Sequence, residues 1–300
     1  MDGTDLDAIA GRDGRFAVLA MDQRNTLRRM LDGAGQPSAD ADLSAFKVDI
    51  VRALAPLSTG VLLDADYGVG PVRAAGVLPP GVGLLVAAEP PVRAQWNGEP
   101  RTGIDPGRRA AYVVENHGDA LKFLVQWRPG RPRNPGEPDL AAEALSVIGE
   151  VVEDCRAAGI PSVIEPLVAR LPDEAPLAPA AAAELVIESA TLMAGTRPDL
   201  LKLEWPGGAE GCRRVTAALG SVPWTLLSAG VAFEQFGERV GVALDNGASG
   251  FIAGRAIWGE AVTLVGEARR AFLDETAVAR LKALCGLLSE HGRPWREAAA

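Results

Sequence analysis

ALKFLVQW at residues 120–127 and PSVIEPLV at residues 161–168 decide the fold, together with the helical pattern that separates them. Both are short, largely apolar runs of the length expected for buried strands. Between them, apolar residues recur every three or four positions over 139–158, as they do on one face of a helix. A strand, a helix and a second strand in this order predict a right-handed βαβ unit with two parallel strands.

The same alternation extends over the whole chain. Six further apolar runs predict strands at residues 16–22, 59–66, 81–89, 199–206, 224–231 and 250–255. Helical patterns cover 39–56, 178–194 and 232–246, and 256–290 predicts closing C-terminal helices. Eight such units favour an α/β fold, a (β/α)8 TIM barrel built as a single domain by residues 1–300. The Pro-rich stretch 128–138 predicts a long loop after the fourth strand.

The composition excludes several classes of protein. A net charge of −9 argues against general nucleic-acid binding, and no run approaches the roughly 18 apolar residues of a transmembrane helix. The acidic start MDGTDLDAIAGRDG has no apolar signal core, so we expect a cytoplasmic protein. Three cysteines without a CxxC pair and only two histidines offer little for a metal site or a Ser-His-Asp triad.

Lysine is scarce, and half of the lysines lie in predicted strands. Only four of the 30 basic residues are lysine, and Lys122 and Lys202 lie in two of the apolar runs. The bulky apolar residues on either side of each lysine share the opposite face, so both lysines should point into the barrel. A lysine near another cation loses its proton more readily, which predicts that one of the two is a Schiff-base nucleophile. The alternative is a buried ion-pair network with Glu165 and Glu204.

Acidic residues and glycines near strand ends complete a candidate site. The acidic residues are Asp22, Asp64, Asp66 and Glu165. They fall where barrel active sites form and could share proton transfer with the lysines. The last two strands end in Ser-Ala-Gly at 228–230 and Gly-Arg at 254–255, where barrels frequently bind phosphate. Tight turns alone would also account for these glycines.

Taken in order, these segments resemble the tagatose-1,6-bisphosphate aldolase family, which includes the sulfofructosephosphate aldolases. The matching segments include AMDQRNTLRRML (20–31), FKVDIVRALAPLSTGVLLDADYG (46–68), LLKLEWP (200–206), LLSAGV (226–231) and GFIAGRAIW (250–258). The resemblance covers nearly the whole chain. It implies a (β/α)8 barrel and class I aldolase chemistry that uses no metal and no other cofactor.

The resemblance also implies roles for individual residues. Lys202 would form the Schiff base, Glu165 would shuttle the proton, and Asp22 and Lys122 would assist. The phosphate of a dihydroxyacetone phosphate half would lie against Ser228, Gly230, Gly254 and Arg255. The remaining substrate-binding residues would be Gln23, Arg24, Arg28, Arg128 and Glu204.

We therefore expect cleavage of a ketose 1-phosphate to dihydroxyacetone phosphate and a three-carbon aldehyde. Arg24, Arg28 and Arg128 are placed to meet a second anion at C6, because each follows strand one or strand four. Trp127 and Arg128 stand where tagatose-type members have an acidic stretch. This favours 6-deoxy-6-sulfofructose 1-phosphate, which gives sulfolactaldehyde, over tagatose 1,6-bisphosphate, which gives glyceraldehyde 3-phosphate.

Two alternatives stay open. A deoxyribose-phosphate-type aldolase uses the same lysine chemistry on a smaller donor, and a non-catalytic sugar-phosphate sensor could use the same fold. As partners we expect a small sugar phosphate and further copies of this chain in a homo-oligomer, but neither nucleic acid nor a membrane.

Overall fold

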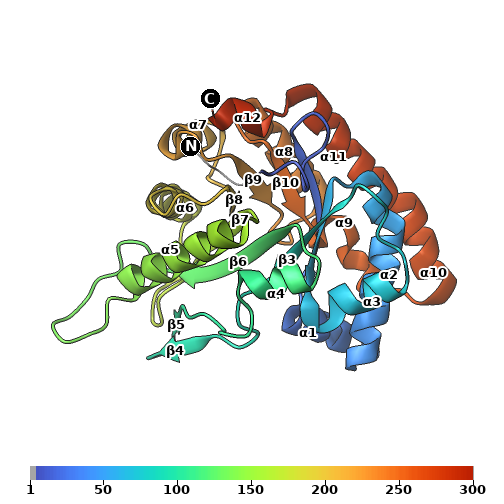
Figure 1. Cartoon of the computed structure of the whole chain (residues 1–300), viewed down its shortest axis with the longest axis horizontal. Helices are drawn as coiled ribbons and strands as arrows, with labels where there is room; N and C mark the ends of the chain where they lie inside the picture. Colours follow the sequence, from blue (N-terminus) through green and yellow to red (C-terminus); the bar gives the residue numbers. More distant parts are fainter. Residues whose placement is uncertain (1–4, 300) are drawn as a thin grey trace.

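The computed structural model describes residues 5–299 and forms the closed, eight-stranded parallel barrel that the alternating pattern predicts (Figure 1). Residues 1–4 and 300, which include the first part of the acidic start, lie outside the described residues. Around the barrel the strands follow the order β1, β10, β9, β8, β7, β6, β3, β2. Their bounds are β1 Phe16–Met21, β2 Gly60–Asp64, β3 Gly83–Ala87, β6 Ala120–Trp127, β7 Ser162–Val168, β8 Leu200–Leu203, β9 Trp224–Leu227 and β10 Gly250–Ala253.

Helices cover the outside of the barrel, and the four long helical patterns correspond to α2, α5, α6 and α8. The helices are α1 Asn25–Gly33, α2 Asp40–Leu54, α3 Gly70–Ala74, α4 Ala110–Glu115, α5 Leu140–Ala158, α6 Pro179–Ala194, α7 Ala209–Leu219, α8 Phe233–Asp245, α9 Arg255–Trp258, α10 Gly266–Ala271, α11 Val278–His291 and α12 Trp295–Ala299. Among the described residues, no helix combines the length and the apolar character needed to cross a membrane.

The chain closes the amino-terminal end of the barrel with its own two ends. Leu6 and Ile9 are buried against the inner apolar cluster, beside which Trp295 packs. Arg15 Nε donates to the carbonyl of Gly292 at 2.6 Å, which ties the segment before β1 to the end of α11. Because these segments cover the amino-terminal end of the barrel, an open site can form only at the carboxyl ends of the strands.

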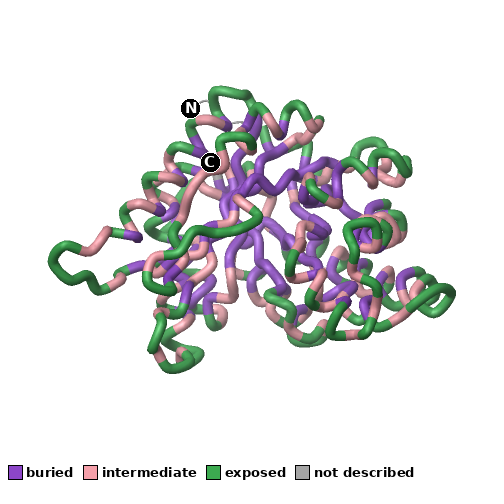
Figure 2. The backbone as a smooth tube through the Cα atoms, turned by 90° about the horizontal axis from the view of Figure 1, so that it is seen from below, coloured by how far each residue is buried: buried purple, intermediate pink, exposed green. Residues whose placement is uncertain are grey.

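The inside of the barrel changes from apolar to charged at one level. The inner apolar cluster contains Ala20, Leu62, Ala87, Ala120, Val163 and Leu200, one from each of six strands. Two residues further along the chain, and so on the same face, stand Asp22, Asp64, Glu89, Lys122, Glu165 and Lys202. Asp22 and Glu89 lie just past the ends of β1 and β3. Figure 2 shows the strands as the buried centre of the molecule, surrounded by helices with exposed outer faces.

A small hairpin that the apolar runs did not predict lies between β3 and α4. Strand β4 Ala94–Trp96 pairs antiparallel with β5 Glu99–Arg101 through Asn97 and Gly98, which both have positive φ. An Asn-Gly pair between two short strands is a strong hairpin signal, so this element could have been predicted. Arg131 from the long loop after β6 holds the hairpin through a bidentate contact to Glu99, with both distances 2.6 Å.

Candidate active site

Lys122 lies at the centre of the charged level of the barrel. Its side chain has no exposed surface, and its Nζ lies 2.8 Å from Asp22 Oδ2, 2.8 Å from Glu165 Oε2 and 3.3 Å from Glu89 Oε1. Burial by itself would lower the pKa of Lys122, but the three carboxylates outweigh burial and raise its pKa above the ordinary value. Lys122 is therefore a permanent cation at neutral pH.

Lys202 has a different environment, although it reaches the same carboxylate. Its Nζ lies 3.0 Å from Glu165 Oε2, and this is its only ion pair among the described residues. Its side chain is 6% exposed and lines two cavities, an inner cavity of about 210 Å³ and an outer cavity of about 510 Å³. Both lysines thus point inward as predicted, and Lys202 is the one that opens onto space where a substrate can bind.

Two carboxylates of the site, Asp22 and Glu204, have pKa values shifted in opposite directions. Burial would raise the pKa of Asp22, but Lys122 and Lys202 outweigh burial and hold it well below its usual range. Burial raises the pKa of Glu204; the Val168 N–H, which donates to its Oε2 at 2.8 Å, opposes this rise, and Glu165 adds to it. Asp22 therefore remains charged, whereas Glu204 takes up a proton more readily than an ordinary glutamate.

Glu89 is a site residue that sequence reasoning missed. Its carboxylate accepts from Lys122 and from the backbone N–H of Leu124 at 3.1 Å, and it forms an ion pair with Arg24 at 3.2 Å. The signal was available, because Glu89 is the last residue of the apolar run 81–89 and lies on the inward face. Arg24 also contacts Asp66 at 3.3 Å, so two carboxylates already balance its charge.

Gln23, another predicted substrate-binding residue, lines both cavities and donates to Asp22 Oδ1 at 3.2 Å.

The last two strands bring together the residues predicted to hold a phosphate. Ser228, Gly254 and Arg255 line the inner cavity with Lys202, Glu165 and Glu204. Gly230 contacts Arg255: its φ of +77° is one that side-chain-bearing residues rarely adopt, and a Cβ there would lie 3.1 Å from Arg255 Cζ. Among residues 5–299, Arg255 forms no ion pair, so its guanidinium charge is available to a ligand.

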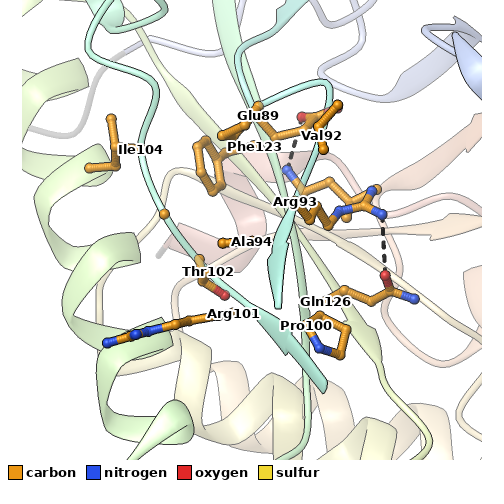
Figure 3. Close-up of a pocket in the computed structure, with 13 residues that line it drawn as sticks. Glu89, Val92, Arg93, Ala94, Pro100, Arg101, Thr102, Ile104, Phe123 and Gln126 are labelled. Carbon is orange, nitrogen blue, oxygen red and sulfur yellow. Dashed lines mark hydrogen bonds between the residues drawn. The ribbon is translucent and has the colours of Figure 1, made fainter. Parts of the chain in front are cut away.

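The outer cavity extends from Lys202 towards the hairpin. Arg29 and Arg93 line it and form no ion pair within the described part of the chain. Arg93 Nη1 donates to Gln126 Oε1 at 3.2 Å, a contact drawn in Figure 3. This contact borders a side pocket of about 170 Å³, whose walls include Phe123 and Ile104 (Figure 3).

Two predicted substrate-binding arginines do not lie in these cavities. Arg128 makes a bidentate contact to Glu174 at 2.7 and 2.8 Å and lines a small pocket beside the long loop. Arg28 contacts Asp40 at 2.7 Å and packs over the ring of Tyr67. Carboxylates from neighbouring segments pair with both guanidinium groups, so the structure does not bring Arg28 and Arg128 together with the residues that line the two cavities.

Comparison with known proteins agrees with this arrangement. A family model described as DeoC/LacD family aldolase matches residues 16–260. A tagatose 1,6-diphosphate aldolase of Listeria monocytogenes is 30% identical over 332 residues, covering 97% of this chain and 92% of the relative. Tagatose 1,6-diphosphate aldolase 2 of Streptococcus agalactiae is 27% identical and covers 97% of this chain and 96% of its own length.

Solved structures show the same fold. An archaeal fructose-1,6-bisphosphate aldolase, with its catalytic Lys covalently bound to the carbinolamine intermediate of the substrate, has a TM-score of 0.62 at 20% identity. The match covers 93% of this chain and 96% of that chain.

Within residues 5–299, no group of three or more His, Cys, Asp or Glu side chains is arranged to hold a metal ion. From its match to the family model and to its named relatives, the chain belongs to the DeoC/LacD family and is a class I aldolase, a lyase that works through a Schiff base.

Proposed function

We propose that Lys202 is the Schiff-base lysine of an aldolase that cleaves a ketose 1-phosphate. The observation that carries this proposal is the contrast between the two inward lysines. Lys122 is fully buried among three carboxylates, which keep it protonated. Lys202 contacts one carboxylate and lines both cavities, so its nitrogen can reach a carbonyl carbon. A Schiff base requires such an accessible amine.

The neighbouring groups then supply the proton transfers. Lys202 Nζ adds to the C2 carbonyl of the open-chain ketose, and loss of water gives an iminium ion. Glu165, 3.0 Å from Lys202, takes the proton of the C4 hydroxyl. The C3–C4 bond breaks, its electron pair moves into an enamine, and C4 leaves as the aldehyde. Protonation at C3 and addition of water release dihydroxyacetone phosphate and the free lysine.

Lys122 and Asp22 hold the proton-transferring carboxylate in place. The permanent ammonium of Lys122 lies 2.8 Å from both Glu165 and Asp22, so it fixes their relative positions.

The phosphate at C1 is assigned to the inner cavity. Arg255 offers a guanidinium without a carboxylate partner in the described chain, and Ser228 adds a hydroxyl group beside it. A planar guanidinium binds two phosphate oxygens at once, which suits an anion held at a fixed distance from the nucleophile.

The far end of the substrate is assigned to the outer cavity. Besides Arg255, which lines both cavities, Arg93 and Arg29 are the arginines of the outer cavity whose charge is not balanced by a carboxylate of the described residues. Gln126 lies four residues after Lys122 on the same strand face, about 13 Å further along β6. Because Gln126 holds Arg93, the guanidinium is placed well beyond the lysine level, where the C6 group of an extended ketose would lie.

The contacts of Arg128 change which anion, a sulfonate or a phosphate, we expect at C6 of the substrate. The preference for 6-deoxy-6-sulfofructose 1-phosphate depended on Arg128, whose charge is balanced by Glu174 outside the two cavities. The named relatives are tagatose 1,6-diphosphate aldolases. We therefore put tagatose 1,6-bisphosphate first and keep the sulfonate as the second candidate, since Trp127 and Arg128 still replace the acidic stretch of tagatose-type members.

Borohydride trapping tests the assignment of the nucleophile. Reduction of the enzyme with dihydroxyacetone phosphate should add the triose to the peptide that contains Lys202, and Lys202→Met should abolish both the adduct and turnover. An adduct on Lys122 would contradict the proposal. Measuring kcat/KM for tagatose 1,6-bisphosphate, 6-deoxy-6-sulfofructose 1-phosphate and deoxyribose 5-phosphate then identifies the substrate, and a preference for the last would favour the deoxyribose-type alternative.

A further inference from the structure

Lys47 is a third buried lysine, and it lies outside the barrel strands. It belongs to α2, which packs against β1, and its side chain has no exposed surface. Its Nζ donates to the carbonyl of Met21 at 2.7 Å and to the carbonyl of Gln23 at 2.8 Å, and it lies 2.6 Å from Asp64 Oδ2. Two protons of the ammonium group are thus donated to backbone carbonyls, and the Asp64 carboxylate supplies the opposite charge.

The two carbonyls that Lys47 contacts belong to the residues on either side of Asp22. The backbone at Asp22 is therefore held from both sides by one side chain, at the point where β1 has ended and no strand ladder continues. Asp22 in turn lies 2.8 Å from Lys122 and next to the outer cavity. We propose that Lys47 is a positioning residue, which fixes the backbone around Asp22 and through it the arrangement of Lys122 and Glu165.

A packing role alone does not account for a lysine at this position. The same face of α2 buries Leu43, Ile50 and Leu54, so an apolar side chain would fit the pattern of the helix. A buried ammonium is retained only with full compensation. Asp64 supplies the opposite charge and comes from the end of β2, so Lys47 also joins the ends of β1 and β2. The groups that compensate Lys47 are thus the ends of the strands that carry the site.

The inference rests on the proposed function, because Asp22 must contribute to turnover. Its test is a double-mutant cycle between Lys47 and Asp22. The first variant is Lys47→Met/Asp64→Asn, which removes both buried charges together. The amide oxygen that Asp64→Asn introduces can still accept the Tyr67 N–H, which Asp64 caps at 2.8 Å. Lys282→Met, on the exposed face of α11, is the matched control and should turn over like the wild type.

We expect Lys47→Met/Asp64→Asn to lower kcat at least about tenfold while KM for the ketose 1-phosphate changes less than about twofold, because the inner cavity is untouched. Asp22→Asn should also lower kcat about tenfold or more in the wild-type background, but less than about threefold in the Lys47→Met/Asp64→Asn background. This loss of additivity is the result that a merely structural lysine would not give. Lys47→Arg, which still donates to both carbonyls, should recover most of the lost kcat.

Independent effects that multiply, or a kcat equal to that of the wild type, would overturn the inference. Should Lys47→Met/Asp64→Asn not fold, Lys47→Leu/Asp64→Asn carries the same cycle, because an apolar side chain fits the buried face of α2 and donates to neither carbonyl. The two proposals fail in different ways. If Lys202→Met retains turnover, the proposed function is wrong. If Lys202→Met is inactive and the Lys47 variants behave as wild type, only the Lys47 inference is wrong.

Discussion

Replacing Arg255 with alanine removes from the inner cavity a guanidinium that has no ion-pair partner among residues 5–299. Two unit charges about 4 Å apart at an effective dielectric constant of about 20 attract by roughly 4 kcal/mol. The cavity is open to water and the phosphate is partly desolvated on binding, so we expect a loss of about 2–4 kcal/mol, in the range for truncating one partner of a charged pair. This corresponds to a decrease of about 30- to 1,000-fold in kcat/KM.

The assay compares two substrates that differ only at C1. Tagatose 1,6-bisphosphate should lose the full factor with Arg255→Ala, whereas tagatose 6-phosphate, which has no phosphate for this cavity, should change little. Release of the triose product, measured with a coupled dehydrogenase, gives both values. Arg12→Ala is the control for the same change of charge, because Arg12 is exposed before β1, at the opposite end of the barrel.

Two results would refute this reasoning. An unchanged kcat/KM for the bisphosphate would place the C1 phosphate away from Arg255. An equal loss for both substrates would mean that Arg255 supports the shape of the site, for example through its packing against Gly230, and does not bind the phosphate.

Three further outcomes are expected. Arg93→Ala should raise KM for the bisphosphate about tenfold or more, because a charged contact to the C6 anion is lost. Arg128→Ala should leave kcat/KM unchanged for either C6 anion. The reverse pattern in steady-state kinetics would mean that Arg128, and not Arg93, binds the C6 anion. The pKa of Asp22 is depressed in the folded protein, so its stabilising contribution is complete above the unfolded-state pKa of about 4 and is lost as the pH falls below that value. Urea titrations from pH 6 down to pH 3 should therefore show a smaller loss of unfolding free energy for Asp22→Asn than for the wild type, and equal losses would argue against the buried pair with Lys122. Activity should survive dialysis against EDTA, and recovery by added zinc after a loss would contradict metal-free chemistry.

Local periodicity was sufficient to find the barrel and its two inward lysines. Each strand is a short apolar run, and the side chains of a strand alternate between two faces whatever surrounds it. The inward direction of Lys122 and Lys202 therefore followed from their positions within ALKFLVQW and LLKL. The same step of two would also have placed Glu89 in the site, had it been applied to the third strand.

The contacts of Lys47 could not be predicted from periodicity. The pattern of α2 indicates that position 47 is buried, but the carbonyls of Met21 and Gln23 become its partners only when α2 packs beside β1. No spacing in the sequence relates these positions, which lie 26 and 24 residues apart.

The sequence by itself thus determined the strands, the helices between them and the side chains that face the barrel interior, because those depend on alternation along one segment. Only the tertiary structure decided which charges remain available to a substrate. Arg128 and Arg255 both follow barrel strands, yet Glu174, 46 residues from Arg128, balances the first and no carboxylate of the described residues balances the second. The availability of a charge is set by every group that folding brings within a few ångströms of it, and the order of residues along the chain does not contain those distances.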